Sequence, residues 1–247
     1  MAKRSFILTN KNTFSSAKIL RDELEKVYKE KYLVTKKENK KSYFLRFGNS
    51  FGNYSGEINS PEIIKLMSNK KLFSEFLLNE GFLTPEFNKN TDILEFPCII
   101  RENLSLSKGK GIHVVENEKD FFNIWKNNYY WTKFINFKFE VRAHVVGGDL
   151  KKLFIKKWVK NEQPKYPIKN SISCKYILQD ISNENRYRKI KNIINKLKNL
   201  LGEKNFYALD MGFSEEKSNY YIIEGNTAPG LNEKTAKIYA ETLKELL

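Results

Sequence analysis

Three side chains with hard oxygen donors stand close together near the C-terminus of the chain. Asp210 lies in the segment YALDMGF, and Glu224 and Asn226 lie in the segment EGNTAPG. The two segments read as the arms of a β-hairpin, and residues two apart in a strand project to the same face. An ordinary hairpin with solvent-facing acids is the competing interpretation for any one carboxylate. Together the three donors predict a Mg²⁺ site, because Mg²⁺ is usually held through carboxylates and substrate phosphates.

The composition is that of a globular protein with excess positive charge. The chain has 247 residues, 40% of them hydrophobic, and a formal net charge of +15. This length suits one large domain or two to three small lobes. The charge favours anionic partners such as nucleotides, nucleic acid or acidic peptides, although lysines spread through every segment also fit compositional drift. No basic block with interleaved aromatic residues marks a single-strand binding groove.

Neither a membrane span nor a disulfide is predicted. No long uncharged apolar run is present, and the apolar stretch in the N-terminal MAKRSFIL is too short for a signal peptide. Cys98 and Cys174 are the only two cysteines and have no metal-binding spacing. We therefore expect reduced thiols in a cytoplasmic protein.

Hydrophobic periodicity predicts a mixed α+β chain with mainly antiparallel hairpins. Gly147-Gly148 is the expected turn of one hairpin, Gly56 is expected in a loop, and residues 159–183 are expected to be irregular. Helices are expected to start at Ser60-Pro61 and after Ser68 or Asn69. The other expected elements are strands at 5–8, 32–35, 43–47, 96–101, 112–115, 139–145 and 150–158, helices at 16–28, 120–125, 186–201 and 233–247, and a hairpin at 207–223.

From Ser60 to the C-terminus the chain resembles the ATP-grasp fold. The resemblance is to ligases related to the ribosomal-protein glutamate ligases and the D-alanine–D-alanine ligases, including short proteins of phage genomes. EGNTAPG is its most specific motif, since family members there carry a metal-binding Glu and Asn before a substrate loop. The resemblance implies an N-terminal α/β lobe (1–57), an ATP-binding lobe with a glycine-rich loop (58–131) and a C-terminal catalytic lobe with the metal site (132–247). The last two lobes would clamp ATP.

The resemblance also assigns residues to ATP. Phe139-Glu-Val-Arg142 is similar to the family's Glu-x-Arg strand, in which the Glu contacts ribose and the Arg reaches phosphate or an acyl phosphate. Arg142 and the backbone N–H near Gly230 are candidates to stabilise an oxyanion. Arg101 departs from the family's common Lys but keeps the charge. The implied nucleotide-binding residues are Lys70 (or Lys71), Arg101, Ser107, Gly109 and Gly111 of the glycine-rich loop, Lys133, Phe134 and Ile135 of the hinge, Glu140, and Lys156 (or Lys157).

The resemblance implies an ATP- and Mg²⁺-dependent carboxylate–amine ligase that acts through an acyl phosphate and releases ADP and phosphate. Its partners would be a small-molecule or peptide carboxylate and an amine acceptor, and the charge also allows a polyanion. One alternative is a kinase of the same fold that stops at phosphoryl transfer. Another is a basic nucleic-acid-binding protein that keeps the fold. The segments expected to set the substrates, 1–57 and 159–183, match nothing specific.

Overall fold

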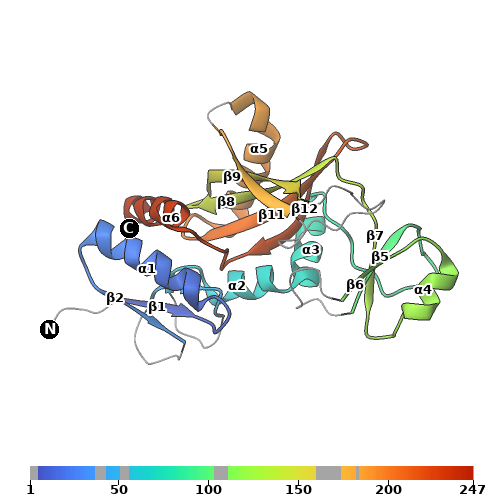
Figure 1. Cartoon of the computed structure of the whole chain (residues 1–247), viewed down its shortest axis with the longest axis horizontal. Coiled ribbons are helices and arrows are strands. Elements are labelled where there is room, and N and C mark those ends of the chain that lie inside the picture. Colours follow the sequence, from blue (N-terminus) through green and yellow to red (C-terminus); the bar gives the residue numbers. More distant parts are fainter. Residues whose placement is uncertain are drawn as a thin grey trace.

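Three β-sheets organise the chain, and the computed structural model describes residues 5–36, 43–50, 56–102, 111–159, 174–181 and 184–246 of it (Figure 1). The N-terminal sheet is parallel throughout. In the order β2-β1-β3-β4 it contains β2 (Tyr32–Thr35), β1 (Ser5–Thr9), β3 (Tyr43–Phe47) and β4 (Gly56–Ile58). Helix α1 (Phe14–Tyr28) joins β1 to β2 and begins earlier than the expected Ser16. The expected loop position of Gly56 is wrong, because this glycine begins the edge strand β4.

Two short helices connect the N-terminal sheet to the rest of the chain. They are α2 (Pro61–Ser68) and α3 (Lys70–Asn79). The side chain of Ser60 accepts a hydrogen bond from the Ile63 backbone N–H, and Asn69 accepts from Lys71 and Leu72. These contacts satisfy donors that a helix leaves free in its first turn. The two helix starts predicted from the sequence are therefore confirmed, with Asn69 as the second cap.

The smallest sheet is antiparallel and stands apart at one end of the molecule (Figure 1). Its strands, in order, are β6 (Ile112–Val115), β5 (Cys98–Arg101) and β7 (Tyr130–Lys133), and helix α4 (Glu118–Ile124) packs on one face. Cys98, Ile100, Phe121 and Trp131 form the core under that helix. Because side chains alternate along a strand, Arg101 projects from the opposite face.

The largest sheet is antiparallel and has five strands. In order they are β10 (Cys174–Gln179), β9 (Asp149–Trp158), β8 (Phe139–Val146), β11 (Phe206–Ser214) and β12 (Asn219–Asn226). Gly147 and Gly148 make the predicted turn between β8 and β9, with φ values of 65° and 76° that suit glycine. The expectation that residues 159–183 are irregular is wrong for 174–179, which form the edge strand β10.

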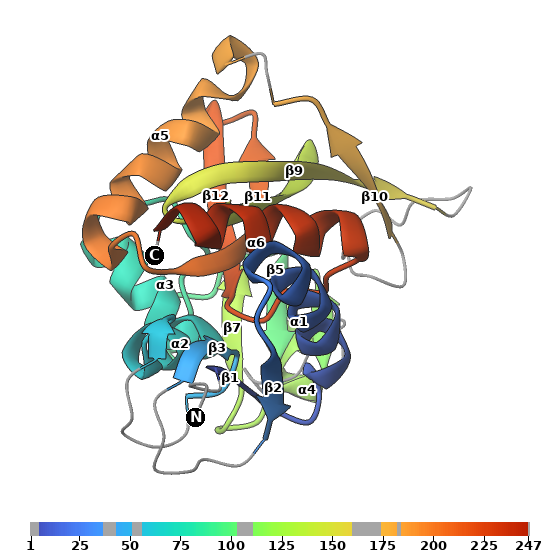
Figure 2. The same cartoon turned by 90° about the vertical axis from the view of Figure 1, so that its left-hand side faces the viewer.

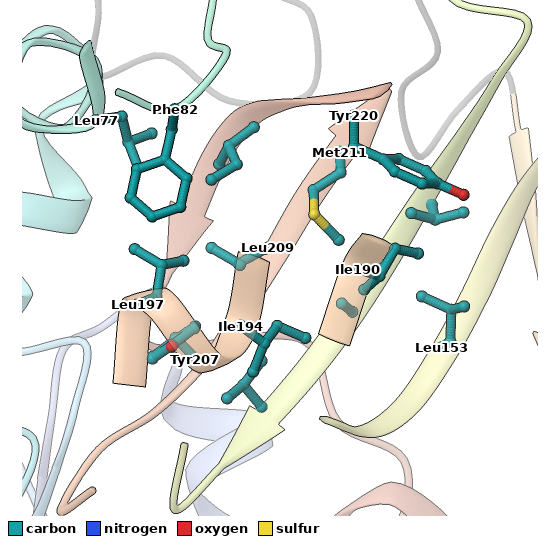
Figure 3. Packing of buried hydrophobic residues seen from close by; sticks show 14 of the residues in the cluster. Leu77, Phe82, Leu153, Ile190, Ile194, Leu197, Tyr207, Leu209, Met211 and Tyr220 are labelled. Atoms are coloured by element: carbon teal, nitrogen blue, oxygen red, sulfur yellow. The ribbon is translucent and has the colours of Figure 1, made fainter. Parts of the chain in front are cut away.

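One face of the large sheet is covered by helices α5 (Glu184–Leu201) and α3 (Figure 3). Ile190, Ile194 and Leu197 of α5 pack against Leu209 and other residues with odd numbers in β8 and β11. The burial of this apolar surface is the main force that fixes the position of the sheet.

The opposite face is divided between a core and a polar region. Helix α6 (Glu233–Leu246) lies between α1 and one end of this face (Figure 2). Val146 and Phe206 belong to the core that these helices share. Farther along this face, β8 carries Arg142 and Glu140, and β11 adds Asp210. None of the described helices combines the length and apolar character needed to span a membrane.

Candidate active site

Charged residues face one another across neighbouring strands in the polar region of the large sheet. The strand register pairs Glu140 in β8 with Lys156 in β9, and Arg142 in β8 with Asp210 in β11. Asp210 in turn pairs with Glu224 in β12. Directly paired residues of antiparallel strands project to the same face. The sheet therefore gathers carboxylates and cations from two hairpins, β8–β9 and β11–β12, that are distant in sequence.

Asp210 is the centre of this cluster and is only 5% exposed. Its Oδ1 lies 2.6 Å from Arg142 Nε, and its Oδ2 lies 2.7 Å from Arg142 Nη2 and 3.0 Å from Lys156 Nζ. Burial alone would raise the pKa of Asp210, but the charges of Lys156 and Arg142 outweigh it and hold that pKa well below its usual range. Asp210 is therefore a carboxylate at neutral pH, with both oxygens bonded to cations.

Arg142 is held on two sides. It forms a two-pronged contact with Asp210, and its guanidinium carbon lies 4.9 Å from the centre of the Tyr176 ring. A guanidinium stacks well on an aromatic face and binds a carboxylate through two parallel hydrogen bonds. Burial opposes its charge, but the Asp210 carboxylate more than compensates, so the pKa of Arg142 is raised. The geometry fixes a positive charge at the middle of the sheet face.

Lys156 bridges two carboxylates. Its Nζ lies 3.1 Å from Glu140 Oε2 and 3.0 Å from Asp210 Oδ2, and the residue is only 6% exposed. Burial would lower the pKa of Lys156, but Asp210 and Glu140 raise it further, which keeps the ammonium charged. Lys157 is exposed. Of the two lysines considered as phosphate ligands, only Lys156 joins the cluster.

Glu224 extends the cluster toward helix α3 and the three-stranded sheet. Lys70 Nζ, at the start of α3, lies 3.2 Å from Glu224 Oε2, whereas Lys71 Nζ lies 2.6 Å from Glu75 and points elsewhere. Burial lowers the pKa of Arg101, and the charge of Glu224 counteracts this shift. Lys70 and Arg101 thus bring positive charge to Glu224 from outside the large sheet.

Asn226 and the loop after it lie beside these carboxylates. Asn226 pairs with Ala208, one step along the same sheet face as Asp210, and its Oδ1 accepts a hydrogen bond of 2.8 Å from Ala228 N. An amide oxygen has a second lone pair that could bind a metal ion. A Cβ added to Gly230 would meet no atom within 4 Å, so its backbone is accessible.

The donor set fits a hard divalent cation. Two opposed carboxylates and an amide oxygen on one sheet face are the ligands that Mg²⁺ prefers. Among the described residues, no group of three or more His, Cys, Asp or Glu side chains could hold a metal ion. A metal here would therefore complete its coordination with oxygens from elsewhere, as Mg²⁺ does with substrate phosphates.

The arrangement of the three sheets is shared with known structures. No family model matches the sequence, and no match was found among curated proteins. A D-alanine–D-alanine ligase from Bacillus anthracis superposes with a TM-score of 0.69 at 14% identity, covering 100% of this chain and 98% of that chain. A RimK domain ATP-grasp protein from Sphaerobacter thermophilus DSM 20745 gives a TM-score of 0.65 at 12% identity, with 98% and 100% coverage. The chain has the ATP-grasp fold.

A third similar structure is that of a differently named enzyme. The N5-carboxyaminoimidazole synthetase from Staphylococcus aureus, solved with ADP, has a TM-score of 0.68 at 14% identity and covers 98% of this chain and 77% of that chain. At such identities the likeness concerns the fold. The α+β ATP-grasp fold predicted from the sequence is confirmed.

In the region expected to be the adenine hinge of the ATP-grasp fold, one backbone N–H already donates a hydrogen bond within the protein. The Phe134 N–H donates to Pro97 O at 3.0 Å, and the Lys133 ammonium pairs with Glu95. Phe134 is buried, and Ile135 follows the end of β7. Of the three expected adenine-reading residues, Phe134 thus uses its N–H within the protein, while Lys133 and Ile135 remain predictions.

The glycine-rich loop of the expected phosphate site is described only at its end. Gly111 has φ of 62°, and its carbonyl accepts a hydrogen bond of 2.9 Å from Glu102 N, which closes the β5–β6 connection. Ser107 and Gly109 lie outside the described residues. Their role at the phosphates remains a prediction.

Three residues near the site were not identified from the sequence. Tyr176 stacks on Arg142 from a strand that was not predicted. Phe137 lies over Gly212, where a Cβ would be 2.3 Å from its ring. Tyr239 of α6 bonds His144 Nδ1 at 2.9 Å and bounds the site at its other end. The spacing of Gly212 two residues after Asp210 was the one available hint, because a glycine within a strand often marks a close approach.

Proposed function

We propose that the protein is an ATP- and Mg²⁺-dependent carboxylate–amine ligase that acts through an acyl phosphate. The observation that carries the proposal is the contact of Asp210 with both Arg142 and Lys156 on the polar side of the large sheet of an ATP-grasp fold. Buried ion clusters are costly unless they are well paired, and strongly shifted pKa values gather at functional sites. The proposal assigns ATP binding to residues 58–131 and catalysis to residues 132–247, beside an N-terminal lobe of residues 1–57.

The charged residues have complementary roles in this proposal. Asp210, Glu224 and Asn226 hold Mg²⁺, which would neutralise phosphate charge and orient the γ-phosphoryl group. Glu140 binds the ribose hydroxyls. The remaining cations, Lys70, Arg101, Arg142 and Lys156, offset the negative charge of the phosphates. Phosphoryl transfer needs this positioning and charge neutralisation more than it needs covalent help from the protein.

The proposed reaction has two steps. An oxygen of the carboxylate substrate bonds to the γ-phosphorus of ATP while the bond to the β-phosphate oxygen breaks, and ADP leaves. The amine nitrogen then attacks the acyl carbon, phosphate leaves with the electrons of the broken C–O bond, and a proton passes to solvent. Arg142 and the backbone N–H near Gly230 are assigned to the oxyanion that forms in this second step. The carboxylate is a small molecule or a peptide.

The test combines product analysis with trapping. The purified chain is incubated with ATP, Mg²⁺ and a panel of amino acids and peptides, and ADP and phosphate are measured. Hydroxylamine replaces the amine in a parallel series, since it converts an acyl phosphate into a stable hydroxamate. We expect substrate-dependent ADP and phosphate, and a hydroxamate with the matching carboxylate. Lys157→Met serves as a control variant, because Lys157 is exposed and outside the cluster.

Each alternative gives a different result. A kinase that phosphorylates a hydroxyl group would release ADP and form a stable phosphate ester, without hydroxamate. A nucleic-acid-binding protein would release no ADP with any carboxylate. AMP and pyrophosphate as products would overturn the acyl-phosphate mechanism.

A further inference from the structure

Each carboxylate assigned to the metal already has a cation bonded to it. Asp210 Oδ2 accepts from Lys156 Nζ at 3.0 Å and from Arg142 Nη2 at 2.7 Å. Glu224 Oε2 lies 3.2 Å from Lys70 Nζ. Both acceptor positions of Asp210 Oδ2 are thus filled, so a metal ion that binds this oxygen must replace one of these two contacts.

The charge of the cluster disfavours a metal ion that arrives alone. Its described members are four cations and three carboxylates, with a net charge of +1: Lys70, Arg101, Arg142, Lys156, Glu140, Asp210 and Glu224. A divalent ion would add two positive charges to a largely buried site, where uncompensated charge is expensive. A triphosphate carries about four negative charges, so it more than balances a divalent ion that binds with it.

Lys156 is the cation best suited to leave Asp210. It reaches Asp210 with a single ammonium on a flexible stem and divides its contacts between Asp210 and Glu140. Arg142 instead holds Asp210 through two parallel hydrogen bonds and is stacked on Tyr176. A phosphate oxygen could therefore draw Lys156 away while Arg142 keeps its place.

We propose that Lys156 occupies the metal-binding oxygen of Asp210 until the nucleotide's phosphates bind this lysine, so that the divalent cation binds with the triphosphate and not before it. The inference rests on the proposed function, since it assigns Asp210 to the metal. It gives Lys156 two alternating partners, Asp210 before nucleotide binding and a phosphate after it.

The test measures binding of Mn²⁺ alone, by the electron paramagnetic resonance signal of the free ion, without nucleotide. Wild-type protein is compared with Lys156→Met, which removes the ammonium, and with Lys156→Gln, which keeps a hydrogen-bond donor without the charge. Lys157→Met is the matched control on the same strand. We expect both Lys156 variants to bind Mn²⁺ at least tenfold more tightly than wild type, and Lys157→Met to match wild type. Thermal unfolding of each variant shows which of them are folded. One folded Lys156 variant is enough to compare its Mn²⁺ affinity with that of wild type.

A second measurement separates this inference from the proposed function. Calorimetric titration with the non-hydrolysable analogue AMP-PNP, with and without Mg²⁺, reports nucleotide binding to wild-type protein. We expect binding that strengthens when Mg²⁺ is present. If AMP-PNP binds but the Lys156 variants gain no Mn²⁺ affinity, the role of Lys156 is overturned while the proposed function stands. If AMP-PNP does not bind, the proposed function and the inference both fall.

Discussion

Asp210 and Glu224 face each other on one side of the large sheet because β12 contains one extra residue. Met211 pairs with Ile222 and Asp210 pairs with Glu224, so Ile223 has no partner in β11. Without this bulge, strict alternation would turn Glu224 to the apolar face on which Ile222 packs. The bulge therefore delivers a carboxylate to the polar face at the point where the strand leaves the core.

The two opposed carboxylates should respond differently when each is neutralised. Asp210→Asn removes the carboxylate paired with buried Arg142 and leaves Lys156 with Glu140 alone, so it should lower the free energy of unfolding by about 3 kcal/mol or more. Glu224→Gln affects an ion pair that is partly exposed, since the side chain of Lys70 is 20% exposed and that of Glu224 is 33% exposed. This variant should lower the free energy of unfolding by about 1 kcal/mol or less. Both should abolish ADP formation, because each removes a proposed metal ligand. Urea unfolding and an ADP assay measure the two effects.

Saturating Mg²⁺ is the control for this pair of variants, since a weakened site can be filled at high metal concentration. Wild-type rates of ADP formation in both variants under saturating Mg²⁺ would contradict the proposed metal site. Equal losses of stability would contradict the difference in burial between Asp210 and Glu224.

Gly212 should tolerate no side chain. A Cβ at this position would lie 2.3 Å from the Phe137 ring, so Gly212→Ala should destabilise the protein by about 1–3 kcal/mol through overpacking. In the double variant with Phe137→Ala the total cost should be smaller than the sum of the two single costs, because the clash is gone. Gly230→Ala is the matched control, with no atom within 4 Å of its Cβ. Additive costs in the double variant would show that the ring is not the obstacle.

The sequence predicts those parts of the fold that depend on local signals. The helix cap at Ser60, a second cap at Ser68 or Asn69, and the turn at Gly147-Gly148 are short-range features, and the structure has all three, with Asn69 as the second cap. The polar face of Glu140 and Arg142 follows from alternation within one strand. Local hydrogen bonding and backbone geometry determine each of these, so neighbouring residues carry the information.

The remaining features depend on contacts between distant segments. The bulge at Ile223 arises from the register with β11, which is a property of two strands and not of one. Tyr176 reaches Arg142 because β10 pairs with β9, and the sequence around Tyr176 does not reveal this pairing. Similarly, the N–H of Phe134 donates to the carbonyl of Pro97, which directly precedes β5. The sequence identified candidate side chains for the site but could not show which of them contact one another.

His144 should make the folded state sensitive to acid. The residue is 3% exposed and bonds Tyr239 Oη, and burial together with the charge of Arg142 lowers the pKa of His144 to about 3. The unfolded chain has a pKa near 6.5 at this residue, so between about pH 6.5 and 3 it binds a proton that the folded protein excludes. The contribution of neutral His144 to the free energy of unfolding is therefore fully present above pH 6.5. Below pH 6.5 it declines by up to about 1.4 kcal/mol per pH unit.

The comparison that isolates this contribution is His144→Phe, which retains an aromatic ring next to Phe154 and Tyr239. The free energy of unfolding of both proteins is measured in urea from pH 7 to pH 4.5. The difference between wild type and variant should shift in favour of the variant as the pH falls. A constant difference over this range would show that His144 titrates normally in the folded state.

Tyr176 should position Arg142 for catalysis. Its ring lies 4.9 Å from the guanidinium carbon, and a partly buried contact of this kind contributes about 1 kcal/mol. Tyr176→Leu should therefore lower kcat by about tenfold or less while the Kd for AMP-PNP stays within about twofold, and Tyr176→Phe should restore kcat because it keeps the ring. If Tyr176 had only a structural role, Tyr176→Leu would weaken nucleotide binding and lower thermal stability together. Tyr176→Phe would then not restore one property apart from the other.

Arg142 should be needed for chemistry more than for nucleotide affinity, in a reaction that forms ADP. Its guanidinium is fixed by Asp210 and Tyr176 at the middle of the site, where it can bond oxygen atoms that gain charge during the reaction. An interaction made mainly in the transition state lowers kcat and kcat/KM together when it is removed. Arg142→Ala should bind AMP-PNP within a few-fold of wild type and lose turnover by about a hundredfold or more, the scale of a lost oxyanion donor.

Arg142→Lys provides the matched control, because it keeps the charge but not the two-pronged contact with Asp210. If charge alone were sufficient, this variant would recover wild-type turnover, whereas we expect it to remain well below wild type because a lysine cannot hold the planar geometry. Normal turnover with weakened AMP-PNP binding in Arg142→Ala would instead assign this residue to nucleotide recognition. Thermal unfolding is measured alongside, since loss of Arg142 leaves Asp210 with Lys156 as its described cation.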